Sequence, residues 1–549
     1  MCIYHAIQRP IFLKHAKKFL FWFFLMLIFL QTNKGLVYAQ DHSGILGILN
    51  NNALNVALND SNQLHSSWDV LSSHWETPEW IKDAKFGLWI HWGPQSVPRL
   101  GGGWYARHMY MQDVGDQQWG RNAYDYHCEH YGHPSTYGYK DLIHHEFKAR
   151  KFDAYELVKQ FKSWGARYVV MLANHHDNYD LFPSTVHKWN SVRVGPHRNL
   201  IGEFVSAARN LGLPYGFTTH AYRAKSWFEP AYGADEQGSK KGVPYDGRLT
   251  IADGKGKWWD GLNPQQLYAH EYAKFHEEYG KRLLELVTHY QPKMLYFDTY
   301  SIPSPAKKAC IRLYANSLEK HGSIQSIVTV KSPKTGTMLE VERGGSDTIK
   351  SSPFQTGTSM YTGWFRKEDE NKNLWFDTRC LVEMLVDNVS KNGVLMLNVA
   401  LYGNGSLPKD QKHVLDGLAA WLDINGEAIY KTRPWKYYGV GGEVKDGHFT
   451  QRTRFSSEPW DSDVLRFTRS KDNKTLYVFV FGEPAGEDII IQPPPGEQKL
   501  FQGQIQNLSI LGIRDSIVAE LDTQGLHVNM PGELYPSTCH VIKIQTTGL

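Results

Sequence analysis

The stretch MLYFDTY, residues 294–300, is an apolar and aromatic run that carries a single carboxylate, Asp298. Five further runs are almost continuously apolar: KFGLWIHW (85–92), RYVVMLANHH (167–176), LPYGFTTH (213–220), SIQSIVTV (323–330) and GVLMLNVA (393–400). Runs of this kind are typical of parallel strands that are buried on both faces. An ionised carboxylate is rare in such a setting unless it has a partner or a function. The position of Asp298 at the end of an expected core strand therefore needs an explanation.

Amphipathic segments with recognisable ends lie between these runs. The first begins with a capping box made by Asp153 and Glu156, and Gly165 ends it just before the next strand. Similar stretches cover residues 268–290, 306–321, 376–390 and 409–424. The alternation of strand and helix predicts an α/β fold, a (β/α)8-like TIM barrel. Functional residues of such a barrel gather at the C-terminal ends of its strands.

The pattern changes after Arg433, Pro434 and Trp435. Short β-rich runs follow, separated by turn residues such as PPPG (493–496): KTLYVFVFG (474–482), DIIIQ (488–492), GLHVNM (525–530) and CHVIKIQ (539–545). They predict a C-terminal antiparallel β-sandwich over residues 436–549, with the barrel over residues 76–435.

The N-terminal residues have the character of a secretory signal. Lys14, Lys17 and Lys18 precede the apolar run FLFWFFLMLIFL (19–30), and VYAQ (37–40) offers a small-residue cleavage site. A membrane anchor is the alternative, but this run is shorter than the ~20 residues that a spanning helix needs. We therefore expect a signal peptide at 1–39, a lead-in at 40–75, and an exported protein, periplasmic or extracellular in a bacterium.

Charge and cysteine content exclude several functions. Without residues 1–39 the chain has 55 Lys and Arg against 56 Asp and Glu, so its formal charge changes from +4 to −1. This balance predicts neither a nucleic-acid partner nor binding to an anionic membrane. Four cysteines remain, too sparse for a disulfide framework and without zinc-site spacing, although an exported chain could pair two: Cys128, Cys310, Cys380 and Cys539.

Polar side chains stand at the ends of four expected strands: His91, the group His175, His176 and Asp177, then His220, and Asp298. They could cap turns and lie hydrogen-bonded in the core, but their clustering at the functional face of a barrel makes that interpretation weaker for the whole set. They could bind a metal, yet neighbouring strand residues point to opposite faces unless the strand has ended before them. The third interpretation is glycoside hydrolysis, in which a fixed Asp attacks the anomeric carbon while a second carboxyl protonates the leaving oxygen.

Several segments carry a resemblance to a known family. They are KFGLWIHWGPQSVP (85–98), WYARHMY (104–110), YGHPSTYGYKDLI (131–143), ARYVVMLANHHDNYDLFPS (166–184), HKWNS (187–191), LYFDTY (295–300) and VSKNGVLMLNVA (389–400). In order and spacing they resemble glycoside hydrolase family 29, the α-L-fucosidases, from about Trp80 to Trp435. The likeness is greatest to bacterial members with an ERGG-like segment (342–345) and an HA-x-x-A-x-x-W turn (220–227).

The resemblance implies a retaining exo-α-L-fucosidase that acts on fucosylated glycans or fucose-containing polysaccharides, with no metal and no organic cofactor. It assigns the nucleophile to Asp298, and Tyr296 stands where many members have Trp. Tyr296 is expected to bind the sugar together with other residues: His91, Trp92, Trp104, His175, His176, His220, Arg343 and Trp364. A fucose-binding protein without activity, or a metal-dependent hydrolase, remains an alternative function.

The position of the proton donor varies within the family. Glu342, in the loop-like stretch EVERGGSD (340–347), is the expected acid, and Arg343 beside it could orient it or contact sugar oxygens. Glu340 and Asp347 are rivals, and Glu342 could instead pair with Arg343 at the surface.

Three departures from the family pattern concern the substrate. Gly101, Gly102 and Gly103 replace an acidic residue that often precedes the Trp of WYAR, which would make the subsite less acidic and roomier. This predicts tolerance of a substituted or sulfated fucose, because a repelling carboxylate is lost. Gly357 stands where Asp is common, and Asn178 replaces the glycine of HHDG.

Overall fold

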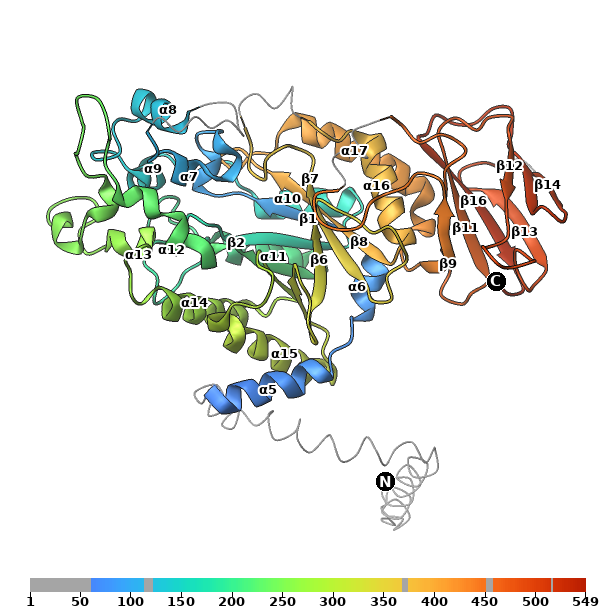
Figure 1. Cartoon of the computed structure of the whole chain (residues 1–549), viewed down its shortest axis with the longest axis horizontal. Helices are drawn as coiled ribbons and strands as arrows, with labels where there is room; N and C mark the ends of the chain where they lie inside the picture. Colours follow the sequence, from blue (N-terminus) through green and yellow to red (C-terminus); the bar gives the residue numbers. More distant parts are fainter. Residues whose placement is uncertain (1–60, 113–121, 368–373, 451–457, 515–516) are drawn as a thin grey trace, which may run out of the picture. The chain divides into compact units, whose positions relative to one another are not determined.

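The computed structural model describes residues 61–112, 122–367, 374–450, 458–514 and 517–549 (Figure 1). The chain divides into two compact units, residues 1–71 and 72–549. In the first unit the described residues belong to helix α5 (Ser61–Ser73), which occupies part of the expected lead-in. The expected signal peptide lies outside the described residues. Within the described ranges, no helix combines the length and apolar character needed to cross a membrane.

The second unit begins with a closed barrel of eight parallel strands, which confirms the predicted fold class. Each strand pairs with its neighbours in chain order, and β8 closes the ring against β1. The strands are β1 (Phe86–His91), β2 (Tyr168–Asn174), β3 (Tyr215–Thr219), β4 (Met294–Phe297), β5 (Ile327–Val330), β6 (Met338–Glu342), β7 (Phe354–Ser359) and β8 (Gly393–Ala400).

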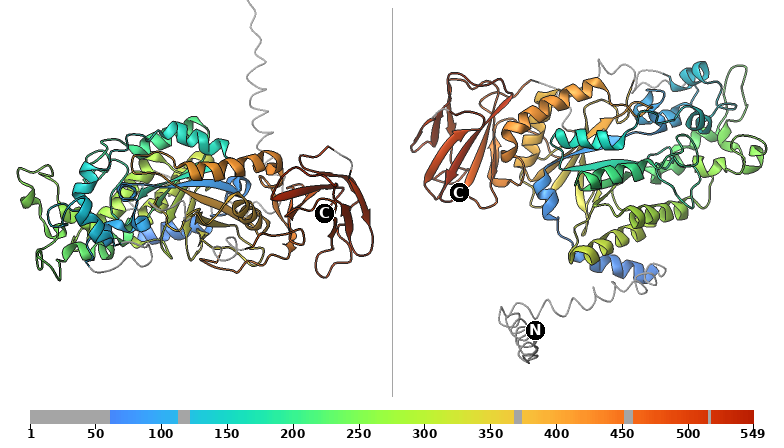
Figure 2. Two further views of the ribbon diagram at one scale, coloured as in Figure 1. Left: turned by 90° about the horizontal axis from the view of Figure 1, so that it is seen from above. Right: turned by 180° about the vertical axis from the view of Figure 1, so that it is seen from behind.

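Helices cover the outside of this ring (Figure 2). They are α10 (Ala154–Ser163), α11 (Leu200–Asn210), α14 (Phe275–Tyr290), α15 (Lys307–His321), α16 (Thr378–Ser390) and α17 (Lys409–Asn425). The carboxylate of Asp153 accepts a hydrogen bond from the backbone N–H of Glu156 at 3.0 Å, as the capping pattern predicts. Helix α14 starts later than expected, because Ala269 adopts a left-handed conformation and ends the short helix α13 (Pro264–Tyr268).

The sequence pattern does not predict two barrel strands, β6 and β7, because they carry polar side chains into the barrel. Gln355 donates a hydrogen bond to Glu340 at 2.8 Å, and Tyr168 donates one to Gln355 at 3.2 Å. Buried polar groups that satisfy one another are compatible with a core, but they remove the continuous apolar run that identifies a buried strand. Glu342 is thus the last residue of β6 rather than part of a loop.

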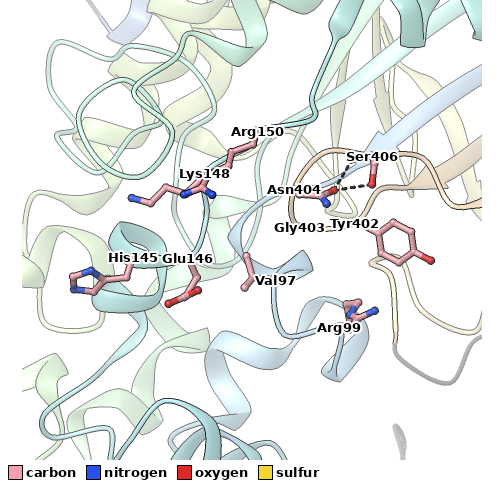
Figure 3. Close-up of a pocket in the computed structure, with 10 residues that line it drawn as sticks. All are labelled: Val97, Arg99, His145, Glu146, Lys148, Arg150, Tyr402, Gly403, Asn404 and Ser406. Atoms are coloured by element: carbon pink, nitrogen blue, oxygen red, sulfur yellow. Dashed lines mark hydrogen bonds between the residues drawn. The ribbon is translucent and has the colours of Figure 1, made fainter.

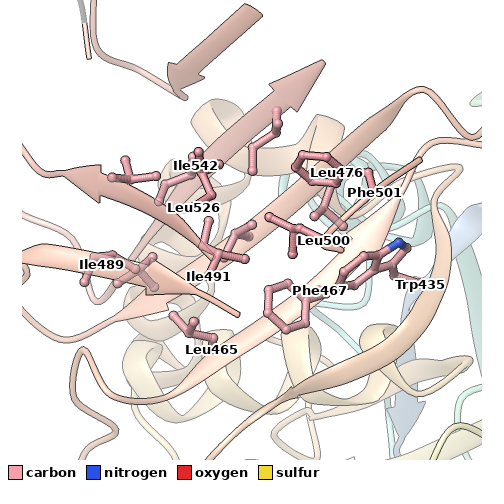
Figure 4. Packing of buried hydrophobic residues seen from close by; sticks show 14 of the residues in the cluster. Trp435, Leu465, Phe467, Leu476, Ile489, Ile491, Leu500, Phe501, Leu526 and Ile542 are labelled. Atoms are coloured by element: carbon pink, nitrogen blue, oxygen red, sulfur yellow. The ribbon is translucent and has the colours of Figure 1, made fainter. Parts of the chain in front are cut away.

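The C-terminal part forms two antiparallel sheets, as predicted for a β-sandwich. One sheet has the order β13-β16-β11-β10-β9 and the other β12-β15-β14. Their bounds are β9 (Arg433–Val440), β10 (Leu465–Arg469), β11 (Thr475–Phe481), β12 (Asp488–Ile491), β13 (Ile505–Ile510), β14 (Val518–Leu521), β15 (Leu526–Asn529) and β16 (Cys539–Thr546). Side chains of both sheets, among them Phe467, Ile489 and Ile542, pack into one apolar core (Figure 4).

Polar contacts join this sandwich to the last helices of the barrel. The buried Arg466 of β10 donates to Asp387 of α16 at 2.8 Å, and Trp421 of α17 donates to the carbonyl of Cys539 at 2.9 Å. Among the cysteines of the described residues, Cys310, Cys380 and Cys539 are buried and Cys128 is partly buried.

Candidate active site

A pocket of about 570 Å³ opens at the C-terminal ends of the barrel strands. Nearly all the residues expected from the sequence line it together: His91, Trp104, His175, His176, His220, Tyr296, Asp298, Glu342, Arg343 and Trp364. Parallel strands bring these positions to one edge of the barrel although they are far apart in the chain.

Trp92 is the exception among the expected substrate-binding residues. It is fully buried, its indole N–H donates to the carbonyl of Tyr402 at 2.9 Å, and its ring stacks on Phe152 with centroids 4.6 Å apart. Trp92 directly follows His91, and successive side chains of an extended strand point to opposite sides. The structure therefore gives Trp92 a packing role behind the pocket wall.

A lysine joins the two candidate catalytic carboxylates. Lys331 Nζ lies 2.5 Å from Asp298 Oδ1 and 2.6 Å from Glu342 Oε2. Because one nitrogen makes both contacts, these two carboxylate oxygens lie at most about 5 Å apart. Arg343, the partner expected for Glu342, instead donates to the carbonyls of Tyr361 and Thr362.

The surroundings of Asp298 favour its ionised form. Burial acts to raise the pKa of this carboxyl, but the hydrogen-bonding imidazole of His220 and the ammonium of Lys331 hold the pKa well below its usual range. The nearest imidazole atoms are His220 Nδ1 at 3.3 Å and His176 Nε2 at 3.5 Å from Oδ2. An ionised oxygen at the edge of a pocket is what a nucleophilic carboxylate requires.

The hydrogen bonds of His91 and His175 assign their tautomers. Asn398 donates from its amide nitrogen to the carbonyl of Trp364, so its oxygen faces His91, and His91 Nδ1 donates to that oxygen at 2.8 Å. Nδ1 of His175 accepts from the amide nitrogen of Gln95 at 2.9 Å. Burial lowers the pKa of both histidines well below the usual value, so both are neutral. His91 therefore presents an acceptor nitrogen, Nε2, and His175 presents a donor N–H.

His176 and His220 complete the set beside Asp298. His176 Nδ1 donates to the carbonyl of His220 at 2.8 Å, and burial lowers the pKa of His176 to about 4. Its Nε2 is thus an acceptor that faces an acceptor oxygen of Asp298. Nε2 of His220 is buried and has no partner among the described residues. Both atoms call for a ligand that brings hydroxyl groups, which donate and accept hydrogen bonds.

Aromatic rings form the floor and one wall of the pocket. Trp89 lies at the floor with its ring centroid 5.2 Å from that of Tyr296 and 5.2 Å from that of Trp364. The guanidinium of Arg343 lies over the Trp364 ring at 4.4 Å and over Trp375 at 5.2 Å. The pocket therefore pairs hydrogen-bonding histidines with apolar ring faces, a combination that suits a sugar.

The rival carboxylates do not line this pocket. Glu340 lies one step down the barrel interior and is fully buried, which raises its pKa to about 8, so it is protonated at neutral pH. Asp347 is exposed, outside the pocket. Glu342 is therefore the carboxyl that shares the pocket with Asp298 and can reach a sugar bound there.

Close contacts in the structure explain two of the three sequence departures. A side chain at Gly103 would meet the ring of Phe365 at 2.8 Å, and its φ of +112° also favours glycine, so Phe365 fills the room that the sequence suggested was open. A side chain at Gly357 would meet Glu340 Oε1 at 2.2 Å. The missing acid on β7 is thus matched by a buried acid on β6.

The third departure is Asn178, which replaces a glycine of the family pattern. It has a φ of +58°, a conformation that Gly and Asn adopt most readily, so the backbone of the glycine position is preserved. Its side chain donates to the carbonyls of Gln266 and Leu267 and accepts from Arg282.

Other pocket residues were missed from the sequence: Arg223, Tyr300, Lys331, Trp375, His448 and Phe449. Lys331 directly follows the run SIQSIVTV, so the rule that polar residues gather at strand ends could have found it. His448 and Phe449 come from beyond the barrel, and no local pattern marks them.

The metal interpretation has partial geometric support. His175 and His176 lie beyond the end of β2, so the alternation of a strand does not separate them. Nitrogen and oxygen atoms of His176, His220 and Asp298 lie within 4.8 Å of one another, as do nitrogens of His91, His175 and His220. The ammonium of Lys331, however, already lies at hydrogen-bond distance from Asp298 and opposes a second cation there.

A second cavity, of about 600 Å³, lies beside the loops that follow β1 and β8 (Figure 3). Arg99, Lys148 and Arg150 line it together with Glu146 and Tyr402. None of the residues expected from the sequence contributes to it. We therefore assign the candidate active site to the pocket at the C-terminal ends of the barrel strands, which contains Asp298 and Glu342.

Comparison with known proteins agrees with this assignment. The model of the α-L-fucosidase family matches residues 52–427. The α-L-fucosidase of Dictyostelium discoideum is 26% identical over 502 residues, 88% of this chain and 95% of that protein, and the tissue α-L-fucosidase of Rattus norvegicus is 28% identical over 67% and 73% of the two chains. The Thermotoga maritima α-fucosidase in complex with fucose has a TM-score of 0.63 and 25% identity, over 87% of this chain and 99% of that one. Since the family match covers most of its length, this chain belongs to the α-L-fucosidase family, glycoside hydrolase family 29.

Proposed function

We propose that this protein is a retaining exo-α-L-fucosidase with Asp298 as nucleophile and Glu342 as acid and base. The observation that carries the proposal is the spacing of the two carboxylates, whose oxygens bound to Lys331 lie at most about 5 Å apart. Retaining glycosidases place their carboxyl groups about 5–5.5 Å apart, whereas inverting enzymes need about 6.5–9.5 Å to admit a water.

The reaction then has two steps. An oxygen of Asp298 bonds to the anomeric carbon as the bond to the leaving oxygen breaks, and Glu342 gives its proton to that oxygen. In the second step Glu342 takes a proton from water, the water oxygen bonds to the same carbon, and Asp298 leaves as a carboxylate. The low pKa of Asp298 supports the first role, because attack requires its ionised form.

The pocket chemistry supports a neutral, hydroxyl-rich sugar. His91 and His176 offer acceptor nitrogens, His175 offers a donor, and the buried Nε2 of His220 lacks a partner among the described residues. The floor formed by Trp89 suits an apolar sugar face. Fucosylated oligosaccharides and fucose-containing polysaccharides are the proposed substrates.

The decisive experiment compares wild type with Asp298→Gly on an aryl α-L-fucoside, with and without azide. We expect the variant to lose hydrolysis and to regain turnover with azide, giving β-fucosyl azide, because azide takes the place of the missing carboxylate. Fucose binding without hydrolysis by the wild type would favour the non-catalytic alternative. Loss of activity with EDTA would favour the metal-dependent one.

Two finer proposals concern the substrate and the location. Tolerance of a sulfated fucose is supported by the absence of an acid at 101–103 and by the exposed Arg223 at the pocket. A parallel assay on sulfated and unsulfated fucosides tests it, and equal or faster hydrolysis of the unsulfated one would count against it. Export through residues 1–39 is tested by sequencing the N-terminus of the protein from the native host.

A further inference from the structure

We propose that residues 441–450, which follow the first strand of the C-terminal sheet, form the subsite for the leaving group, with Phe449 as the surface for its sugar ring. The inference rests on the proposed function and adds the part of the substrate on the other side of the cleaved bond. The ligand class is a pyranose with an apolar C–H face, linked to the fucosyl group.

The segment leaves the C-terminal sheet and returns to the barrel. At its start, Arg466 donates hydrogen bonds to the carbonyls of Val440, Gly441 and Gly442. Further on, the backbone N–H of Gly447 donates to the carbonyl of Gly345 at 3.2 Å. The two backbones approach so closely that a side chain at Gly344 would meet the Gly447 carbonyl oxygen at 1.9 Å. The contact therefore depends on Gly344 of the ERGG segment.

The same segment holds the backbone of the candidate acid. The N–H of Glu342 donates to His448 Nδ1 at 3.0 Å, and the N–H of Phe449 donates to the carbonyl of Glu342 at 2.8 Å. Both polar backbone groups of Glu342 are thus bonded to residues from beyond the barrel. Whatever accepts a proton from Glu342 lies next to this segment.

The side chain of Phe449 is 62% exposed although it lines the pocket, and its φ is +61°. A large apolar ring in solvent and an uncommon backbone conformation both carry a free-energy cost. The cost of exposing the ring is removed when a ligand covers it. Because the leaving oxygen must reach Glu342, the sugar attached to that oxygen passes beside Phe449.

Two substrates with different leaving groups test this subsite. α-L-Fucosyl fluoride has no ring on the leaving side, whereas an α-L-fucosyl-hexose disaccharide has one. We expect Phe449→Ala to lower the ratio of kcat/KM for the disaccharide to kcat/KM for the fluoride about tenfold, and Phe449→Trp to keep it within about twofold. Tyr155→Ala, which removes a 45% exposed ring from α10, is the matched control and should leave both rates unchanged.

The outcomes separate this inference from the proposed function. If wild type hydrolyses both substrates and Phe449→Ala lowers both rates equally or neither, the subsite is overturned while the proposed function stands. If wild type hydrolyses neither, the proposed function and this inference fail together. Thermal unfolding of each variant checks that the rates belong to folded protein.

Discussion

Lys331 should be essential for efficient hydrolysis, although it makes no covalent contribution to either step. Its ammonium donates to Asp298 and to Glu342 at 2.5 and 2.6 Å, and its side chain is only 10% exposed. Lys331→Met keeps most of the side-chain volume and removes the charge. Two carboxylates at most about 5 Å apart would then repel each other without a shared cation.

The magnitude follows from the bonds that are lost. A hydrogen bond between charged groups contributes about 1.5–3 kcal/mol, and each 1.36 kcal/mol changes a rate tenfold. If one such interaction is needed in the transition state, kcat/KM for an aryl α-L-fucoside should fall about 10- to 100-fold. Lys331→Arg, which keeps the charge, should lose less.

The pH profile distinguishes this role from simple loss of structure. Asp298 must be ionised to attack, and Lys331 is one of the groups that keep its pKa low. Without Lys331 the pKa of Asp298 rises, so the acidic limb of kcat/KM against pH should move to higher pH. A Lys331→Met enzyme with kcat/KM within twofold of wild type and an unmoved acidic limb would refute this reasoning.

Three further predictions concern the frame of the site. Burial raises the pKa of Glu340 to about 8 from an ordinary 4.5. The buried carboxyl therefore lowers the free energy of unfolding progressively as the pH rises from the pKa of the unfolded chain to that of the folded protein. In urea unfolding, Glu340→Gln should be more stable than wild type at pH 8 but not at pH 4. Arg466→Met breaks a buried ion pair with Asp387 and should lower the free energy of unfolding by about 3 kcal/mol, whereas the exposed pair Lys412–Asp416 should tolerate Lys412→Met within about 1 kcal/mol. Trp92→Phe loses the hydrogen bond to Tyr402 and should lower the melting temperature with KM within twofold of wild type; a large rise in KM in a stably folded variant would return Trp92 to the substrate site.

The sequence could predict the barrel because six of its strands are apolar on both faces, and it could predict most of the pocket because polar residues gather at strand ends. Asp298 and the four histidines follow that rule directly. Trp92 shows the limit of that rule. It follows His91 directly, and the next side chain of an extended strand points away from the pocket, so Trp92 packs against Phe152 behind the pocket wall. The missed strands β6 and β7 show a second limit. Gln355 donates a hydrogen bond to Glu340 inside the barrel, so these strands lack the apolar run that identifies a buried strand.

The same pair of strands shows why a change at one position is hard to interpret from sequence alone. Gly357 suggested a lost acid, but the space beside it holds the carboxyl of Glu340. The relation between Gly357 and Glu340 is visible only when β6 and β7 lie side by side. Gly103 suggested a roomier subsite, but Phe365 fills that room from a loop more than 200 residues later. We therefore expect substrate preference in this pocket to depend on pairs of positions from different loops. The proposed subsite at Phe449, whose backbone N–H donates to the carbonyl of Glu342, extends that expectation to a segment beyond the barrel.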